Sequence, residues 1–149
     1  MMGSSVFVIE RARPEEAAAL LEYLKIVGGE TDNLSFGAEG VPLSLEAEQD
    51  YLRAQCGSAD NVQYFAKVDG EAWWGCGAAA ALMEAILAFA KENGFEQLNL
   101  EVRSSNVRAI HLYEKYGFRK LCTFPHFFKI NGKYVDFDLM NLELNETDA

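Results

Sequence analysis

The feature that most constrains this chain is an apolar stretch, residues 78–93, which carries one charged residue, Glu84, before Lys91. Its apolar side chains recur at helical spacing on two adjacent faces: Leu82, Ile86 and Phe89 form one stripe, and Met83, Leu87 and Ala90 form the other. A helix that is apolar on two faces has to be covered on both, so the rest of the chain must fold around it. We expect a largely buried, centrally packed helix that ends at Gly94.

Strand-like and helix-like patterns alternate on both sides of this stretch. The strand-like segments are residues 6–9, 62–68, 97–102, 121–130 and 134–144. Helices are expected to begin at Pro14, at Ser44, at Ala78 and at Ser105 or Asn106, and glycines are placed to end them at Gly28-Gly29, Gly57, Gly94 and Gly117. Asn131-Gly132 predicts a tight hairpin turn, and residues 30–42 follow neither period and predict a long loop.

The length of the chain predicts a single domain over residues 1–149. With 149 residues, of which 50% are hydrophobic, it can bury one core without a metal or a disulfide. No internal repeat or linker-like change of composition divides it. We therefore expect one α/β (α+β) domain with a mixed, mostly antiparallel twisted sheet flanked by helices.

The charge balance narrows the classes of partner. Thirteen Lys and Arg against 23 Asp and Glu leave a formal net charge of −10. The summed field repels phosphate backbones and anionic membranes, so neither nucleic acid nor membrane is an expected partner. A cationic small molecule would be attracted by the same field.

Cysteine usage and the N-terminus point to a cytoplasmic setting. The chain has three cysteines, Cys56, Cys76 and Cys122, without the spacing of a metal site, and this odd number is small for a secreted disulfide scaffold. Residues 1–5 lead directly into a strand-like segment, so we expect no signal peptide. The longest uncharged run, residues 72–83, is shorter than the ~20 residues that span a bilayer.

A glycine turn precedes the apolar helix. Gly75-Cys76-Gly77-Ala78-Ala79 would bring free backbone N–H groups to a helix N-terminus, where the helix dipole favours an anion such as pyrophosphate. By itself the turn is equally well explained as the punctuation that starts a helix. The residues also fit a dinucleotide fingerprint, G-x-G-x-x-G/A, with Glu101 as the ribose-binding acid. Against that reading, the segment before the turn is a poor buried strand and the chain ends in an antiparallel hairpin.

The segment after the next strand is more specific. Its residues Asn106, Ala109, Leu112, Tyr113, Lys115, Gly117 and Phe118 follow the pattern N-x-x-A-x-x-L-Y-x-K-x-G-F. In order and spacing this resembles the signature of the GNAT superfamily of acetyl-CoA-dependent N-acetyltransferases. Trp74-Gly75-Cys76-Gly77-Ala78-Ala79 resembles that family's pyrophosphate motif, Q/R-x-x-G-x-G/A, with Trp74 in place of Gln or Arg. The resemblance extends over residues 6–144 with one break.

The resemblance implies a role for each of these residues. The backbone amides of Cys76, Gly77, Ala78 and Ala79, beside Trp74 and Gly75, would hold the pyrophosphate of acetyl-CoA or CoA. Asn106 would contact the pantetheine arm, cap the following helix, or do both. Tyr113 would be the general acid that protonates the departing CoA thiolate, because a phenol stays protonated at neutral pH; its alternative role is aromatic packing. No metal is implied.

The base that accepts the proton of the amine is not assigned. Glu101, Glu30 and Asp32 are candidates, but each is better explained as a solvated charge or a polar residue flanking a helix. His111 and His126 do not form a pair typical of a metal site or a triad. Cys76 has no neighbours that would lower its pKa, which leaves a covalent acyl-cysteine route as a weaker alternative.

The resemblance breaks between Val68 and the glycine turn. The family has two further antiparallel strands there, which would need about 15–25 residues, whereas this chain offers only Glu71 to Trp74. Either a hairpin is truly lost, or the molecule contains a stretch that these 149 residues omit. A real loss would leave the strand 98–102 without its parallel neighbour, which favours the second explanation. An intact mass well above 16.6 kDa would support it, and a mass of 16.6 kDa would refute it.

The function that these observations predict is acetyl transfer from acetyl-CoA to a primary amine, either a small cationic amine or a protein N-terminus. One alternative is a non-catalytic CoA-binding protein on the same scaffold. A weaker one is a nicotinamide-dinucleotide module. The sequence leaves open whether the chain forms a homodimer.

Overall fold

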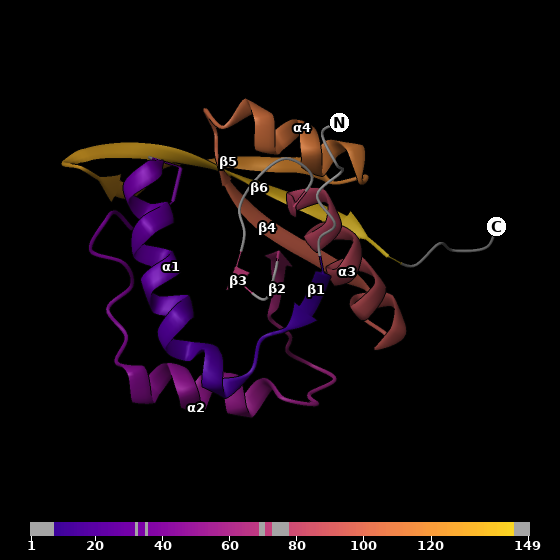
Figure 1. The fold of residues 1–149 in the computed structure, drawn as a ribbon. Coiled ribbons are helices and arrows are strands. Elements are labelled where there is room, and N and C mark those ends of the chain that lie inside the picture. Colours follow the sequence, from indigo (N-terminus) through magenta and orange to yellow (C-terminus); the bar gives the residue numbers. More distant parts are fainter. Residues whose placement is uncertain (1–7, 32, 35, 69–70, 73–77, 145–149) are drawn as a thin grey trace, which may run out of the picture.

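The computed structural model describes residues 8–31, 33–34, 36–68, 71–72 and 78–144. The strands are β1 (Val8–Arg11), β2 (Tyr64–Val68), β3 (Glu71–Ala72), β4 (Gln97–Arg103), β5 (Arg119–Ile130) and β6 (Lys133–Glu143). The helices are the 3₁₀ turn η1 (Pro14–Glu16), α1 (Ala17–Glu30), α2 (Leu45–Gln55), α3 (Ala78–Glu92) and α4 (Val107–Lys115). Figure 1 shows their arrangement.

The strands form two three-stranded sheets, in the orders β1-β2-β3 and β4-β6-β5. The pairs β1/β2, β2/β3, β4/β6 and β5/β6 are all antiparallel. This is the fold class predicted from the sequence, an α/β chain with antiparallel sheets flanked by helices. Nothing joins the two sheets by strand pairing within the described residues.

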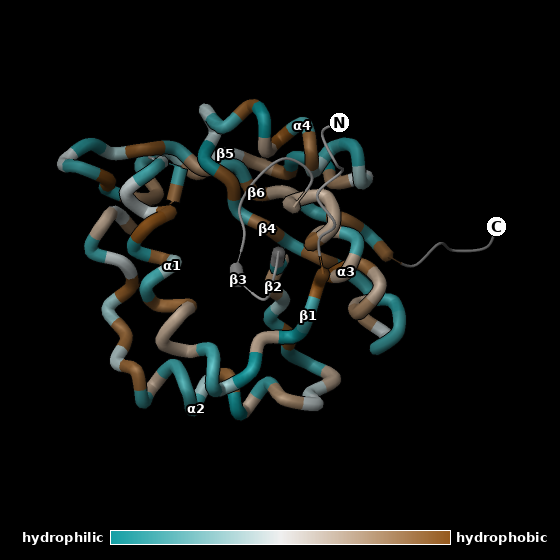
Figure 2. Tube along the Cα trace, viewed as in Figure 1, coloured by the Kyte–Doolittle hydropathy of each residue, from teal (hydrophilic) through white to brown (hydrophobic). Residues whose placement is uncertain are grey.

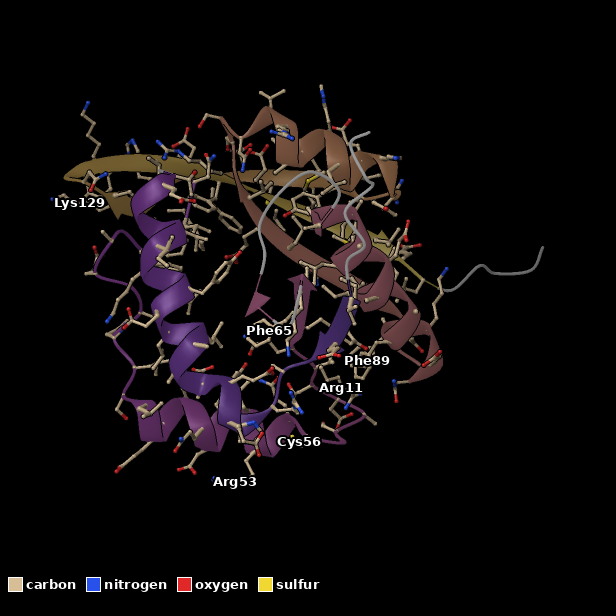
Figure 3. All side chains as sticks on the ribbon, in the orientation of Figure 1. Arg11, Arg53, Cys56, Phe65, Phe89 and Lys129 are labelled. Carbon is tan, nitrogen blue, oxygen red and sulfur yellow. The ribbon has the colours of Figure 1, made fainter. Side chains whose placement is uncertain are left out.

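Helix α3 packs against strands of both sheets (Figure 1). On one side the ring of Phe89 meets Tyr64 of β2 edge to face, with centroids 6.5 Å apart, and the guanidinium of Arg11 lies 5.1 Å from the Phe89 ring (Figure 3). On the other side Met83 belongs to the core of the C-terminal sheet. The predicted central position is therefore confirmed.

The prediction that α3 is largely buried is wrong. Only Ala78, Met83, Phe89 and Ala90 of this helix are buried, and Glu84, Ile86 and Ala88 are exposed. The two sheets cover part of the helix surface, and the described residues provide no third layer. Figure 2 shows α3 largely in the tan of moderately hydrophobic residues, whereas α2 is mostly teal.

Two hydrophobic cores correspond to the two sheets. The first lies between β2 and the helices α1 and α2, and consists of Ala12, Ala17, Leu20, Leu52 and Phe65. The second lies between one face of β4 and β6 and the helices α3 and α4, with Met83, Val102, Phe118 and Met140 at its centre. The helices α1 and α2 thus cover the N-terminal sheet, and α3 and α4 cover the C-terminal one.

Most helix ends lie where the sequence predicts them. The Ser44 hydroxyl accepts a hydrogen bond from the Ala47 amide at 3.1 Å and begins α2. Gly94 and Gly117 follow α3 and α4 with positive φ angles. Asn131 and Gly132 both have positive φ, as a type I′ hairpin turn requires.

The predicted end of α1 is wrong. This helix runs through Gly28 and Gly29 to Glu30. Gly28 is buried, and a Cβ atom there would overlap the backbone of Gly37 in the loop that follows. The glycine lets that loop approach the helix, so it serves packing rather than termination.

Candidate functional site

The N-terminus of α3 is the first part of the predicted site. Of its residues, Trp74, Gly75, Cys76 and Gly77 lie outside the described part of the chain. Ala78 and Ala79 form the first turn of α3, and no acidic side chain stands in that turn. Small, uncharged side chains leave the amide groups of a first turn open to an anion, so this end of the helix fits a pyrophosphate.

Asn106 begins α4, as predicted. Its side-chain Oδ1 accepts a hydrogen bond from the Ala109 amide at 3.3 Å. Of the two capping residues that the sequence allowed, Ser105 and Asn106, the structure selects Asn106. Its Nδ2 group has no hydrogen-bond partner among the described residues and is available to an acceptor.

The turn between β4 and α4 is fixed to strand β6. The Ser104 amide donates to the Asp136 carbonyl at 3.0 Å, and the Ser104 hydroxyl donates to the Asp138 carboxylate at 2.6 Å. The Thr123 hydroxyl of β5 donates to the same carboxylate oxygen at 2.7 Å. Burial opposes ionisation of Asp138, but these hydroxyls and the charge of Lys120 outweigh it, so the pKa of Asp138 is lowered. A buried, ionised Asp138 therefore holds the residues that precede Asn106.

Tyr113 lies on α4 and packs against the core of the C-terminal sheet. Its ring meets Phe118 edge to face, with centroids 5.9 Å apart. Burial raises the pKa of the Tyr113 phenol above its usual value. The phenol therefore keeps its proton throughout the neutral range, which is what a proton donor needs.

Tyr116 joins the two helices of the site. Its hydroxyl lies 3.3 Å from the Ala80 carbonyl oxygen and 3.1 Å from Oε1 of Glu84, both on α3. Through this contact the structure brings the end of α4 that follows Tyr113 against the first turn of α3, which carries Ala78 and Ala79 (Figure 1). The end of α4 therefore contacts the helix that carries Ala78 and Ala79, the two described residues of the first motif.

The candidate bases are not gathered at this site. Glu101 on β4 and Glu30 at the end of α1 are exposed, and Asp32 lies outside the described residues. His111 and His126 are exposed, as are the thiols of Cys56 and Cys122. In the described part of the chain no three His, Cys, Asp or Glu side chains are grouped as a metal site would require.

The break seen in the sequence is visible in the sheets. Strand β3 has two residues and pairs with β2 through Lys67↔Ala72 and Val68↔Glu71. Strand β4 pairs with β6, and within the described ranges its other edge has no strand beside it. The antiparallel pairing of β4 also argues against the dinucleotide reading, which needs a parallel sheet.

Comparison with known families identifies the scaffold. The model of the acetyltransferase (GNAT) family matches residues 46–118, a range that contains both motif segments. Over this range, which is just under half of the chain, the sequence matches the GNAT acetyltransferase family. No curated protein gives a match.

Solved GNAT structures have the same fold. An acetyltransferase of the GNAT family from Streptococcus pneumoniae gives a TM-score of 0.86 at 24% identity, over 94% of this chain and 100% of that one. The Salmonella typhimurium protein yncA, solved with its cofactor acetyl-CoA, gives 0.80 at 16% identity, over 98% of both chains. A GNAT superfamily phosphinothricin acetyltransferase from Sinorhizobium meliloti, in complex with AcCoA, gives 0.79 at 14% identity, over 94% of this chain and 89% of that one.

Sequence reasoning missed two contacts that shape this candidate site. One is the hydroxyl contact of Tyr116 with α3, and the other is the carboxylate of Asp138 under Ser104. One signal for Asp138 was available: it is an acidic residue in the strand-like run 134–144, and the alternation of that run places it on the face turned to the core. Nothing local distinguished Tyr116 from a packing aromatic, because its acceptors lie 36 and 32 residues away.

Within the described residues, no helix is both long enough and apolar enough to cross a bilayer.

Proposed function

We propose that this GNAT domain, extending over residues 1–149, is an N-acetyltransferase that moves the acetyl group of acetyl-CoA to a primary amine. The observation that carries the proposal is the contact of Tyr116 with Ala80, because it joins the end of α4, the helix of the second motif, to the first turn of α3, which begins with the last two residues of the first motif. The two solved relatives that contain acetyl-CoA support the choice of co-substrate.

The residues present fit this co-substrate. The first turn of α3 offers backbone N–H groups, free of acidic side chains, to the pyrophosphate. Trp74, Gly75, Cys76, Gly77, Ala78 and Ala79 are the residues proposed to bind it. The Nδ2 group of Asn106 is proposed to donate a hydrogen bond to an amide carbonyl of the pantetheine arm, while its Oδ1 continues to cap α4.

In the proposed mechanism the neutral amine attacks the carbonyl carbon of the thioester. A C–N bond forms as the C–S bond breaks, and the electron pair of that bond leaves with sulfur. Tyr113 donates its phenolic proton toward the sulfur, and a base that remains unassigned takes the proton of the amine, directly or through water. The raised pKa keeps the phenol protonated until the C–S bond breaks, and the phenolate that the donation leaves takes a proton from solvent afterwards.

The test is isothermal titration of the intact protein with CoA and with acetyl-CoA, followed by thiol-release assays over a panel of amines. The panel should include a diamine, a monoamine of the same length and a peptide with a free N-terminus. Binding together with thiol release on at least one amine would support the proposal. Absence of CoA binding would remove it.

One observation favours a second candidate, a CoA-binding protein without transferase activity. The outer edge of β4 has no strand beside it within the described residues, and the exposed Glu101 on that strand has no hydrogen-bond partner among them. A chain without a positioned base would bind acetyl-CoA and transfer nothing. CoA binding with no thiol release over the whole panel would support this candidate.

A further inference from the structure

The hydroxyl of Tyr116 links the two helices that the proposed function assigns to different parts of one ligand. Helix α3 presents Ala78 and Ala79 to the pyrophosphate, and α4 carries Asn106 and Tyr113 toward the pantetheine arm and the sulfur. Within the described part of the chain, this hydroxyl makes hydrogen bonds from the end of α4 to α3.

We propose that Tyr116 is a positioning residue, which fixes the first turn of α3 against α4 so that both halves of the CoA site bind one ligand in register. The inference rests on the proposed function, since it needs a ligand that spans both helices. Tyr116 itself is assigned no contact with that ligand.

The hydrogen bond of Tyr116 lies at the turn of α3 whose position would affect ligand binding. Ala80 lies in the same helical turn as Ala78 and Ala79, so a hydrogen bond to its carbonyl restrains that turn directly. The Tyr116 amide donates to the Tyr113 carbonyl at 3.0 Å, which places the other end of the link one turn from the proposed proton donor. The link therefore joins the two functional turns rather than remote parts of the helices.

The Tyr116 hydroxyl can lose one of its two acceptors and still bond to α3. A phenol has one proton, so Ala80 and Glu84 share it. Because both acceptors lie on α3, weakening one leaves the link to the other. Tyr116 also packs its ring against the C-terminal core, so removing the hydroxyl alone leaves the packing of the helices in place.

A site built from two half-sites binds a spanning ligand tightly only while their spacing is correct, because the second contact is then intramolecular. A ligand that occupies one half-site does not sense the spacing. CoA spans both halves, and ADP contains the pyrophosphate half alone. The two ligands therefore separate a positioning role from a general loss of structure.

The experiment compares CoA and ADP binding by calorimetry in the wild type, Tyr116→Phe and Tyr134→Phe. Tyr134 is 62% exposed on the distal hairpin and provides a matched loss of one hydroxyl. We expect Tyr116→Phe to weaken CoA binding about 3- to 10-fold, the effect of one lost hydrogen bond, and ADP binding by less than about twofold. Tyr134→Phe should change neither. Glu84→Gln keeps an acceptor oxygen and should keep the CoA affinity.

Equal CoA affinity in Tyr116→Phe and wild type would overturn the inference and leave the proposed function standing. Equal weakening of CoA and ADP, or loss of the folded state in circular dichroism, would also overturn it, since a merely structural role predicts both. If the wild type bound no CoA, the proposed function would fall first and this inference with it.

Discussion

At the scale of single residues, Tyr113 is the group proposed to act in the chemical step. Its buried phenol has a raised pKa and remains protonated across the neutral range. We expect Tyr113→Phe to lower kcat by about 10- to 100-fold, at the lower end of general-acid effects, and to leave the dissociation constant of CoA unchanged because the ring remains. Stopped-flow thiol release and calorimetry measure the two quantities.

The pH profile provides a control for that variant. Because the raised pKa of Tyr113 lies above its usual value of about 10, the wild-type kcat should show no loss of activity from this group between pH 6 and 9. A Tyr113→Phe enzyme with unchanged kcat would show that another group protonates the thiolate.

Asn106 has an observed role, capping α4, and a proposed role, binding CoA, and substitutions can separate the two. Asp caps a helix as well as Asn does, whereas Ala does not. Asn106→Ala should lower the free energy of unfolding by about 1 kcal/mol and also weaken CoA binding. Asn106→Asp should retain the stability but still weaken CoA binding, because it replaces the Nδ2 donor with a negative oxygen. Urea unfolding and calorimetry distinguish these outcomes, and equal CoA affinity in all three proteins would leave Asn106 as a cap alone.

At the scale of secondary-structure elements, the two glycines in the last turn of α1 have different roles. A Cβ at Gly28 would overlap the Gly37 carbonyl, whereas a Cβ at Gly29 would meet the Ala38 side chain at 3.4 Å, an ordinary contact. We expect Gly28→Ala to destabilise the protein by about 1–3 kcal/mol, as overpacking does. Gly29→Ala should stabilise it by about 0.5–1 kcal/mol through helix propensity.

Melting temperatures of the two variants test this. A shift of the same sign in both would contradict the role assigned to Gly28, since the pair differs only in what lies beside each glycine. The loop that approaches Gly28 includes Gly37, so the same experiment reports on how firmly residues 36–40 pack on α1.

A buried ion-pair cluster ties β1, η1 and β2 together. The ammonium group of Lys67, on a side chain that is 7% exposed, pairs with Glu16 of η1 and lies 3.1 Å from Glu10 of β1. Burial alone would lower the pKa of Lys67, but its hydrogen bonds to Glu16 and Glu10 outweigh that effect and raise the pKa. Burial likewise opposes ionisation of Glu16, yet its bonds to Lys67 and Arg13 leave its pKa lowered.

These shifts define a pH window. A raised Lys67 pKa stabilises the fold below the unfolded value of about 10.4, and a lowered Glu16 pKa stabilises it above about 4.3. We expect Lys67→Met to cost about 1–3 kcal/mol at pH 7, since it strips two acids of their partner, and less below pH 4. The exposed pair of Lys25 and Glu22, 2.9 Å apart, is the control, and Lys25→Met should cost less than about 0.5 kcal/mol.

Urea unfolding between pH 3 and 8 measures the Lys67 effect. A cost that stayed constant over this range would mean that packing of the lysine stem, rather than its charge, stabilises the junction.

The sequence allows the elements with local signals to be predicted. The Asn106 cap, the Ser44 cap and the Asn131-Gly132 turn each depend on one or two residues and their own backbone, and all three are confirmed. The packing role of Gly28 could not be predicted, because it depends on the close approach of Gly37 from the loop that follows the helix. The predicted burial of Ile86 fails for a related reason: helix periodicity identifies an apolar face but cannot show whether a neighbour covers it.

The candidate site divides in the same way. Asn106 and Tyr113 are found from a motif within one helix, and the structure describes both. The link from Tyr116 to Ala80 and the link from Ser104 to Asp138 join residues 36 and 34 positions apart. Spacing along the chain does not predict contacts between residues so far apart. Only the folded structure shows that α4 is held at both ends.

At the scale of the whole molecule, strand β5 forms a long outer edge. It is the terminal strand of its sheet, and Leu121, Phe124 and Phe127 on it are exposed. Lys120, Pro125 and a bulge at His126, whose φ is 54°, interrupt this edge. Charges, proline and bulges are the devices by which sheet edges resist pairing with other chains.

The net charge of −10 acts on the two proposed substrates in opposite directions. The field of the protein repels anionic acetyl-CoA and attracts a cationic amine, and salt screens it over a Debye length of about 10 Å at 0.1 M. Raising the ionic strength from 0.05 to 0.5 M should therefore lower kcat/KM for a diamine several-fold, while kcat/KM for acetyl-CoA stays level or rises. Initial rates at saturating concentrations of the other substrate measure both. A monoamine of the same length carries one charge fewer, so its salt slope should be shallower. Equal slopes for the two amines would mean that the net charge does not select the acceptor, and a protein N-terminus would become the stronger candidate.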